Sequence, residues 1–491
     1  MQAQLRFEPD DTAPHVNPDI YGHFSEHLGK CIYEGLWVGE DSTIPNVRGI
    51  RSDVVKALKA IQVPVLRWPG GCFADEYHWK DGIGPREGRP GIYNSHWGGV
   101  VESNHFGTHE FLDLCEQLGA KPYVSGNVGS GTVNEMQDWV EYISSDADSP
   151  MANLRRKNGR KDPWKLPFFA VGNETWGCGG NMRPEYYADL YRQYNTFIKN
   201  YSGNHVYRIA CGANSRDETW TDVLMQNVGR RMNGLSLHNY TIAHGHWPPS
   251  GSATHFDEAA WIDILHYALG MDSLIKGHCT VMDKHDPEKR IGMVIDEWGT
   301  WYAVEPGTNP GFLYQQNSIR DALVAAVHFH IFQRYADRIS MTNIAQMVNV
   351  LQSVILTDGP RILRTPTYWV FEMFKAHHGG QVVPLTVQSP EYTHGWVTIP
   401  AVSASATKSD ALYLSLANLD PHHGAEVCAE VVPANLKPIE GRLLSASEMT
   451  AHNTFDAPDH VTPKLLTGIR ETSQGVFIDL PPMSVAIVKL A

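Results

Sequence analysis

The chain has 491 residues, of which 42% are hydrophobic and 19% are charged, so it encodes a folded globular protein rather than a disordered one. Its length exceeds one ordinary domain and suits a barrel of roughly 250 residues or more followed by a smaller domain. The formal net charge of −14 disfavours nucleic acid and anionic membranes as partners, because both require a basic surface, whereas a neutral substrate remains compatible with it.

The first residues and the cysteines bear on where the protein works. Residues 1–10 contain no basic segment followed by an apolar one, and no run of about 18 apolar residues occurs, so we expect neither a signal peptide nor a membrane span. The seven cysteines are an odd number and include no CxxC pair. We therefore expect reduced thiols and a cytoplasmic protein.

From about residue 18 to 385, short apolar runs alternate with helical patterns, which is typical of βα units around a parallel sheet. In the first clear unit, Ser52 is expected to cap a helix, and residues 63–68 form the strand after it. In the next unit, Thr108 caps a helix that ends at Gly119.

Eight segments in this region have the pattern of barrel strands. They lie near residues 20–25, 63–68, 122–126, 168–172, 207–211, 234–238, 292–296 and 339–344. The sequence therefore predicts the α/β class, with a (β/α)8 TIM barrel over residues 16–385.

After about Val382 the apolar pattern changes to period two, for example in residues 412–416 and 476–480. Turn residues are dense between these runs. We predict an antiparallel, jelly-roll-like β-sandwich domain over residues 386–491, joined by a strand from residues 1–15.

Two glutamates end apolar runs of this barrel pattern. Glu174 follows the fourth predicted strand, and Glu297 follows the seventh. Because the carboxyl ends of barrel strands meet at the active site, we expect the two carboxyl groups to lie close together. Asp296 is expected to point to the opposite face of its strand from Glu297.

The neighbours of Glu174 favour a catalytic role. Gly172 permits a close approach of the backbone, Asn173 offers a donor and an acceptor, and Trp176 supplies an apolar wall that would raise the pKa of the Glu174 carboxyl. A carboxylate pair suits glycoside hydrolysis, with retention at about 5–5.5 Å separation and inversion at about 6.5–9.5 Å. The sequence leaves both outcomes open.

Polar and aromatic side chains follow several predicted strands, which suits sugar recognition. Trp97, Trp247 and Trp301 lie in predicted loops on the same face; we favour carbohydrate stacking there, with packing against another subunit as the alternative. His238, His244 and His246 invite a metal interpretation. We expect no metal, because there is no HExxH motif and no nearby cluster of carboxylates.

Several motifs in register resemble the α-L-arabinofuranosidases of glycoside hydrolase family 51, nearly from end to end. They are Tyr21–Gly29, Arg67–Gly71, Asp81–Pro85, Gly172–Glu174, Gly177–Met182 and Asp296–Trp298. The resemblance implies a catalytic (β/α)8 barrel with a C-terminal β-sandwich, retention of configuration, no metal or other cofactor, and often a hexamer.

Carried over by motif, Glu174 resembles the acid/base of the family and Glu297 the nucleophile. The arabinose-binding positions of the innermost subsite correspond to Glu26, Cys72, Asn173, His238, Tyr240 and Gln346, and the aromatic loop positions near the entrance to Trp97, Trp247 and Trp301. Cys72 departs from the asparagine present in many relatives, and a thiol is a poorer hydrogen-bond partner.

These observations predict a retaining, exo-acting α-L-arabinofuranosidase that removes terminal arabinofuranosyl units from arabinoxylan, arabinan or derived oligosaccharides. Two alternatives stay open. One is a related retaining barrel glycosidase acting on xylosides or β-glucans, and the other is a non-catalytic carbohydrate-binding protein.

Overall fold

The computed structural model describes residues 1–8, 10–430, 437–472 and 475–491. Eight parallel strands close a barrel in the order β2-β5-β8-β9-β10-β11-β12-β13, so chain neighbours are also spatial neighbours. They are β2 (Gly22–Phe24), β5 (Val65–Trp68), β8 (Lys121–Gly126), β9 (Phe168–Val171), β10 (Tyr207–Asn214), β11 (Gly234–Ile242), β12 (Gly292–Trp301) and β13 (Ile339–Ile344). All eight predicted strands are confirmed.

Helices surround this barrel. They are α1 (Ser52–Ala60), α2 (Thr108–Leu118), α3 (Val133–Ser144), α4 (Pro150–Lys157), α5 (Pro184–Phe197), α6 (Glu218–Val228), α7 (Glu258–Leu269), α8 (Met271–His285), α9 (Ile319–Arg334) and α10 (Pro366–Phe374). None of the helices in the described part of the chain is long and apolar enough to cross a membrane.

The predicted caps of α1 and α2 are wrong by one residue. Arg51 and Gly107 hold the extended backbone of the N-cap position, so Ser52 and Thr108 are the first helical residues. Gly119 ends α2 as predicted, with φ of 74°, in the left-handed region that glycine adopts without strain.

The remaining strands of the described residues form two larger sheets and four short hairpins. One sheet has the order β17 (Leu385–Gln388), β1 (Gln2–Phe7), β22 (Ala425–Glu430), β26 (Gly475–Leu480) and β25 (Ile469–Thr472). The other has the order β16 (Gln381–Val382), β20 (Val402–Lys408), β21 (Leu412–Asn418), β27 (Ser484–Leu490), β23 (Pro438–Ser445) and β24 (Lys464–Leu465). The hairpins are β3 (Asn46–Val47) with β4 (Ile50–Arg51), β6 (Ile92–Tyr93) with β7 (Val101–Glu102), β14 (Ile355–Asp358) with β15 (Arg361–Arg364), and β18 (Glu391–His394) with β19 (Val397–Pro400).

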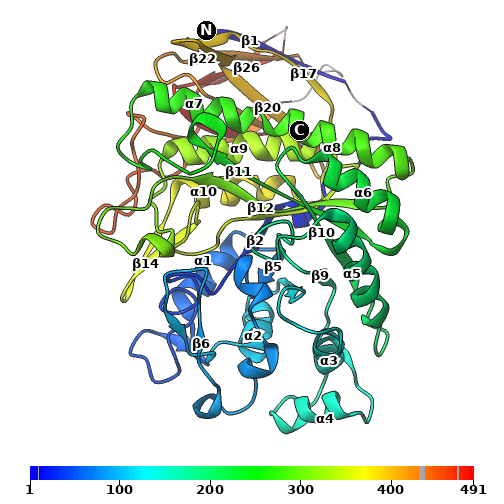
Figure 1. Cartoon of the computed structure of the whole chain (residues 1–491). Coiled ribbons are helices and arrows are strands. Elements are labelled where there is room, and N and C mark those ends of the chain that lie inside the picture. The colour runs from blue at the N-terminus through cyan, green and yellow to red at the C-terminus, as the bar shows by residue number, and fades with distance from the viewer. Residues whose placement is uncertain (9, 431–436, 473–474) are drawn as a thin grey trace.

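The two larger sheets share one apolar core, as expected for a sandwich. Leu5 and Val427 from the first sheet belong to the same buried cluster as Leu414 and Val488 from the second. The N-terminal strand β1 pairs antiparallel with β17 and parallel with β22, and Figure 1 shows the three strands together at the top of the view. The predicted architecture, a barrel with C-terminal antiparallel sheets, is confirmed.

Helix α9 joins the barrel to the sandwich. Its residues from Ile319 to Gln333 are all buried, and it packs on β20, β21 and β27. His330 Nδ1 lies 2.8 Å from Ser403 Oγ across this contact. The sandwich therefore packs on one side of the barrel through α9.

The barrel interior is apolar on the side away from the carboxyl ends of the strands. One buried cluster contains Val65, Tyr123, Ala170, Ile209, Val294 and Met341, one from each of six strands. Such a packed layer closes the barrel to ligands from that side. Polar chemistry is therefore confined to the opposite end.

Candidate active site

Glu174 lies in the turn that follows β9. Gly172 has φ of 85° and Glu174 itself has φ of 40°, a left-handed conformation that is uncommon for a residue with a side chain. The turn is closed by the backbone N–H groups of Gly177 and Gly179, which donate to the carbonyl oxygen of Glu174 at 2.7 and 3.0 Å. This turn directs the carboxyl group into the end of the barrel.

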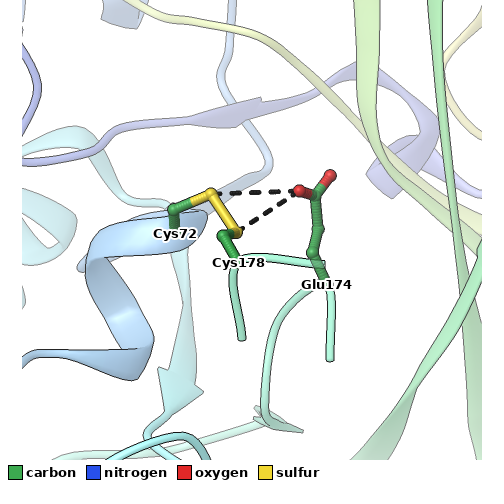
Figure 2. Close-up of side chains that lie close together, drawn as sticks. All are labelled: Cys72, Glu174 and Cys178. Atoms are coloured by element: carbon green, nitrogen blue, oxygen red, sulfur yellow. Dashed lines mark hydrogen bonds between the residues drawn. A yellow bond between two sulfur atoms is a disulfide. The ribbon is translucent and has the colours of Figure 1, made fainter. Parts of the chain in front are cut away.

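A disulfide joins Cys72 to Cys178 beside Glu174, so the expectation of seven reduced thiols is wrong. Figure 2 shows the two sulfur atoms next to the Glu174 carboxyl, with Sγ of Cys178 3.5 Å and Sγ of Cys72 3.9 Å from Oε2. The remaining five cysteines are free. No local pattern predicts this pair, because its members are separated by 106 residues and meet only through the barrel.

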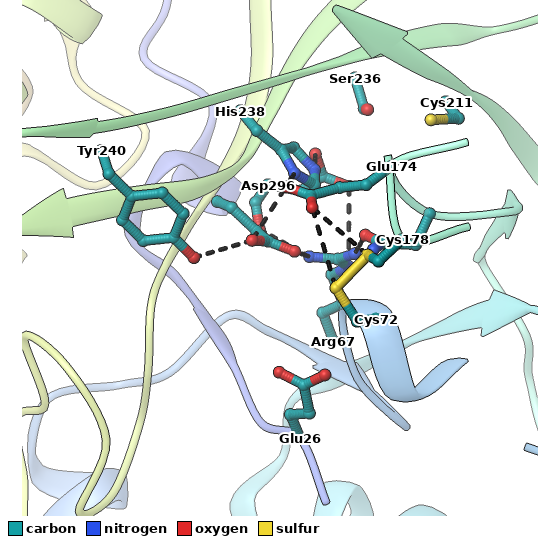
Figure 3. Close-up of polar contacts among 12 residues, drawn as sticks. Glu26, Arg67, Cys72, Glu174, Cys178, Cys211, Ser236, His238, Tyr240 and Asp296 are labelled. Atoms are coloured by element: carbon teal, nitrogen blue, oxygen red, sulfur yellow. Dashed lines mark hydrogen bonds and ion pairs between the residues drawn. A yellow bond between two sulfur atoms is a disulfide. The ribbon is translucent and has the colours of Figure 1, made fainter. Parts of the chain in front are cut away.

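Glu297 faces Glu174 across the barrel end. It lies inside β12, which continues to Trp301, rather than just beyond the strand as predicted. His238 connects the two carboxyl groups, with Nδ1 2.8 Å from Glu174 Oε1 and 3.6 Å from Glu297 Oε2. A carboxylate oxygen of Glu174 lies within 4.8 Å of one from Glu297. Tyr240 donates its hydroxyl to Glu297 Oε2 at 2.7 Å (Figure 3).

Asp296 also contributes to this cluster, and the prediction that it faces away from Glu297 is wrong. Asp296 Oδ1 lies 3.1 Å from His238 Nε2, and its Oδ2 accepts a hydrogen bond from Tyr123 at 2.7 Å. The pairing of β12 with β13 shifts register between Ile295 and Trp298. Such an irregularity breaks the regular alternation of side chains, so two successive carboxylates reach the same pocket.

Arg67 lies at the centre of the site and was absent from our predicted site residues. It is 1% exposed, and its guanidinium donates to Glu297 Oε1 at 2.9 Å and to Asn173 Oδ1. It also lies 3.7 Å from Asp296 Oδ2 and over the ring of Phe24. The motif Arg67–Gly71 could have pointed to this residue. However, the sequence of a strand end does not show which carboxylates an arginine there will pair with.

Two glycines of this motif leave room for the carboxylates. A Cβ atom on Gly71 would lie 2.8 Å from Glu297 Oε1, and one on Gly70 would lie 2.7 Å from Glu26 Cγ. Both positions therefore require the absence of a side chain, which explains the Gly-Gly sequence directly after β5.

Burial and neighbouring charges give the ionisable groups different properties. Burial raises the pKa of the Glu174 carboxyl, and the charge of Glu297 adds to this effect, while His238 and Arg67 oppose it. Burial would lower the pKa of His238, but the charges of Glu297 and Asp296 outweigh it and raise the pKa to about 10. His238 is therefore protonated at neutral pH and donates from both nitrogens.

The pKa values of the Asp296 and Glu26 carboxyl groups are shifted in opposite directions. Burial would raise the pKa of Asp296, but Arg67 and His238 outweigh it and hold the pKa below the ordinary value. Burial, assisted by the charge of Glu297, raises the pKa of Glu26 to about 7.

Glu26 organises a second cluster with two other predicted residues. Its Oε1 accepts hydrogen bonds from Trp97 Nε1 at 2.9 Å and from the backbone of Phe73 at 3.0 Å, and its Oε2 accepts one from Gln346 Nε2 at 2.9 Å. Among the buried polar atoms that have no hydrogen-bond partner in the described residues, two lie at this site: Asn173 Nδ2 and Gln346 Oε1. Buried polar atoms are normally paired, so this donor and this acceptor indicate a polar ligand.

Asp75 positions the loop that carries Asn173 and was not predicted. It belongs to a short helix, η2 (Cys72–Asp75), and accepts hydrogen bonds from the backbone N–H groups of Val128, Gly129 and Asn173. Burial raises the pKa of Asp75 to about 7. No local pattern marks this residue, because its three partners are distant in the sequence.

Aromatic side chains form the outer wall. Trp247 is 64% exposed and contacts Trp301 edge to face at 5.0 Å, and Trp301 contacts Tyr240 in the same way at 4.9 Å. These three residues line a cavity of about 550 Å³ together with Glu174 and Trp176. Trp97 lies apart from them, on the Glu26 side.

Two groups of side chains within the described residues have metal-ligand spacing. They are Cys72, Glu174 and Cys178, and Glu174, His238 and Glu297. His244 and His246 belong to neither. A protonated His238 is a poor ligand for the second group, since a metal requires the neutral imidazole.

A closed eight-stranded barrel with a close carboxylate pair, unpaired buried amides and tryptophans at its polar end defines a barrel glycoside hydrolase. Residues 57–245 match the family model described as alpha-L-arabinofuranosidase 1 domain, and residues 296–484 match the alpha-L-arabinofuranosidase C-terminal domain. The chain belongs to the α-L-arabinofuranosidases of glycoside hydrolase family 51.

Individual relatives agree with this placement. The chain is 51% identical to an intracellular exo-alpha-L-arabinofuranosidase of Bacteroides ovatus, covering 99% of this chain and 95% of that protein. The crystal structure of the GH51 arabinofuranosidase from Xanthomonas axonopodis pv. citri matches with a TM-score of 0.98 and 50% identity, covering 100% of both chains. An arabinose complex from Thermotoga maritima matches with a TM-score of 0.86 and 28% identity, covering 99% of both chains.

Proposed function

We propose that this enzyme releases terminal α-L-arabinofuranosyl units from arabinose-containing oligo- or polysaccharides by a retaining double displacement, with Glu174 as acid/base and Glu297 as nucleophile. The observation that carries the proposal is the close pair of carboxylate oxygens, within 4.8 Å of each other. This distance supports retention, for which the carboxyl groups lie about 5–5.5 Å apart, over inversion at about 6.5–9.5 Å.

The surroundings of the two glutamates support unequal roles. Glu297 accepts hydrogen bonds from Arg67 and Tyr240, which stabilise its negative charge and aim it as a nucleophile. Glu174 has a raised pKa, as a general acid requires. Because protonated His238 donates to Glu174 Oε1, the acidic proton is placed on Oε2.

In the first step, Glu174 protonates the glycosidic oxygen while a carboxylate oxygen of Glu297 attacks the anomeric carbon, which gives a covalent arabinosyl enzyme. In the second step, Glu174 removes a proton from water, and that water releases the sugar from Glu297. Asp296 keeps His238 charged and in place throughout, because it accepts from Nε2.

The arabinose ring would lie among the buried polar groups of the inner pocket. Asn173 Nδ2 and Gln346 Oε1 supply a free donor and a free acceptor for sugar hydroxyls, and Glu26 supplies a carboxyl group beside them. His238 and Tyr240 would contact the arabinose ring on the side where the two catalytic glutamates lie. Cys72 would contact the sugar as a disulfide sulfur, which has no proton to donate.

The remainder of the substrate would extend over Trp247 and Trp301 in the outer cavity, where flat aromatic faces suit sugar rings. The name of the Bacteroides relative supports exo action on single terminal units. Arabinan and the hemicellulose arabinoxylan would supply such units.

The decisive experiment compares Glu174→Ala with the native enzyme on aryl and alkyl α-L-arabinofuranosides. Loss of the acid should slow hydrolysis of the alkyl substrate by about 10²–10⁴-fold and spare the first step for an aryl leaving group. Near-native hydrolysis of the alkyl substrate would contradict the assignment. Proton NMR of the first-formed product should show the α-anomer, and the β-anomer would contradict retention.

A panel of nitrophenyl glycosides tests the substrate. The α-L-arabinofuranoside should be cleaved faster than the β-D-xyloside and the β-D-glucoside. A preference for either of the latter would favour the alternative activity on xylosides or β-glucans, and no turnover of any would favour a binding protein.

We further propose a cytoplasmic homo-oligomer, in which a hexamer is the state that the family resemblance implies. The name of the Bacteroides relative supports the location.

For the domain division we propose residues 16–385 and residues 386–491 with 1–15, which the pairing of β1 with β22 supports. Cell fractionation tests the location, light scattering tests the oligomeric state, and limited proteolysis tests the domain division.

A further inference from the structure

The Cys72–Cys178 disulfide closes the pocket on the side of Glu174. Cys72 begins η2, which is separated from the end of β5 by three residues, and Cys178 follows Glu174 by four residues in the turn after β9. Their Cα atoms are 5.5 Å apart, and both side chains point to the same carboxyl oxygen, Glu174 Oε2 (Figure 2). The pair therefore contacts the oxygen that carries the acidic proton in the proposed reaction.

The three side chains have the spacing of a metal site. One ligand atom from each of Cys72, Glu174 and Cys178 lies within 4.8 Å of the other two. A tetrahedral Zn²⁺ with Zn–S bonds of about 2.3 Å and a Zn–O bond of about 2.1 Å places a sulfur and an oxygen ligand about 3.6 Å apart. The sulfur-to-Oε2 distances here are 3.5 and 3.9 Å. Only the two sulfur atoms would have to separate.

We propose that Cys72, Cys178 and Glu174 form a redox-gated inhibitory site for a thiophilic divalent cation such as Zn²⁺. While the disulfide is intact, its sulfurs have no charge and the site does not bind the ion. After reduction, two thiolates and one carboxylate form an S₂O donor set, which suits Zn²⁺. Bound metal takes the place of the acidic proton on Glu174 Oε2 and so stops hydrolysis.

The chemistry balances with a dithiol as reductant. The S–S bond of Cys72–Cys178 breaks and takes up two electrons and two protons, while the two thiols of the reductant lose them and join in a disulfide. Zn²⁺ then displaces one proton from each cysteine thiol, and a third from Glu174 when that carboxyl is protonated.

The surroundings favour a three-ligand site with an open fourth position. His238 is the nearest further donor, but Glu174 engages one of its ring nitrogens and Asp296 the other, so it is not a ready ligand. The charges of Asp296 and Glu297 offset those of His238 and Arg67, so that a cation is tolerated.

The other cysteines provide a matched control. Cys31, Cys115 and Cys211 are buried, and Cys279 and Cys428 are partly exposed. None of them belongs to a group with metal-ligand spacing in the described segments of the chain. Cys428→Ser therefore removes a thiol of the strand β22 without changing the proposed site.

The experiment measures binding separately from activity. The aerobically purified enzyme should show five thiols after denaturation, and seven after treatment with a phosphine, which takes an oxygen from water as it reduces the disulfide. Reduced enzyme should bind one equivalent of Zn²⁺ in equilibrium dialysis, and Co²⁺ in its place should give a thiolate-to-metal charge-transfer band. The oxidised enzyme should do neither.

Activity should follow binding. Zn²⁺ at saturation should lower hydrolysis by the reduced enzyme by about 10²-fold or more, because it removes the general acid, and a chelator should restore it. Zn²⁺ should leave the oxidised enzyme unchanged. Cys178→Ser should weaken Zn²⁺ binding by the reduced enzyme at least about 100-fold and abolish the cobalt band, whereas Cys428→Ser should behave like the native enzyme.

Three results would overturn the proposal: seven thiols in the untreated enzyme, no Zn²⁺ binding after reduction, or equal binding by Cys178→Ser and the native enzyme. The proposal relies on the assigned role of Glu174 only for the activity measurement. If reduced enzyme binds Zn²⁺ with the cobalt signature yet hydrolyses normally, the metal site stands but its inhibitory role fails, and the Glu174→Ala kinetics decide the acid/base assignment separately.

Discussion

The two sides of the catalytic pocket hold the same kind of carboxyl group in different surroundings. The Glu297 side is a strand, β12, where the glutamate is 6% exposed and bound by Arg67 and Tyr240. The Glu174 side is a turn in which the glutamate is 17% exposed, has a positive φ, and contacts a disulfide and one histidine nitrogen. On the strand side, two hydrogen-bond donors stabilise the negative charge of Glu297. On the turn side, the carboxyl group of Glu174 can gain and lose a proton.

This difference accounts for the division of labour. A nucleophile must stay ionised and aimed, which a buried guanidinium and a tyrosine hydroxyl ensure. An acid/base must gain and lose a proton in each cycle. The Glu174 carboxyl can do so because it is buried and has few hydrogen-bond donors to hold it ionised. The strand side is therefore expected to be the more sensitive to substitution.

The largest effect should come from the strand side. Glu297→Gln removes the nucleophile, and we expect kcat to fall at least about 10⁴-fold for aryl and alkyl arabinosides alike. Steady-state assays with both substrates measure this, with Glu102→Gln, another buried carboxyl, as control. A loss confined to the alkyl substrate would exchange the roles of the two glutamates.

Replacing the guanidinium that fixes Glu297 should be the next largest change. Arg67→Lys loses the planar contacts to Glu297 and Asn173, so kcat/KM should fall about 10²-fold through misplacement of both. Incomplete pairing of the buried carboxylates should lower the free energy of unfolding by up to about 3–5 kcal/mol.

The control for this change is Arg89→Lys. Arg89 forms a buried pair with Glu110 away from the catalytic carboxylates. It should lose stability in denaturant titrations but keep kcat/KM. Equal kinetic losses in both variants would show that Arg67 acts only through stability.

A smaller effect concerns pH and the turn side. Activity of the native enzyme should fall as pH rises through the raised pKa of Glu174, because the acid is then deprotonated. His238→Asn removes a positive donor that lowers this pKa, so the alkaline limb of kcat/KM should move to higher pH. His246→Asn should leave the limb in place, and a shift to lower pH in His238→Asn would contradict the assigned coupling.

The smallest effect on kcat/KM should come from substitutions at the pocket entrance, which lies outside both the strand side and the turn side. Trp247→Ala should lower kcat/KM for an arabinosylated xylo-oligosaccharide, relative to an aryl arabinoside, by about 2–10-fold, the value of one aromatic contact. Trp396→Ala removes a more exposed tryptophan on the β18–β19 hairpin and should change neither substrate. An unchanged ratio in Trp247→Ala would exclude stacking at this position.

Much of this arrangement could be predicted from the sequence. Short apolar runs that alternate with helical patterns identified all eight barrel strands, and the strand ends identified Glu174, Glu297, His238 and Tyr240 as neighbours. Local patterns suffice here because the barrel repeats one unit, and each unit delivers its strand end to the same face.

Other features could not be predicted. Asp296 was assigned to the wrong face, because a register shift in β12 depends on the neighbouring strand β13 and not on β12 alone. The Cys72–Cys178 pair was assigned as free thiols, because two cysteines on β5 and β9 loops meet only once the barrel closes. The central role of Arg67 depends on partners from β12 and from the turn after β9.

The sequence by itself determined the strands, the order of the units and the residues at their ends, because hydrophobic periodicity is a local property. Tertiary structure alone decided which side chains share a hydrogen bond, a charge or a disulfide. Those outcomes depend on distances of a few ångströms between segments far apart in the chain, and closure of the barrel sets them.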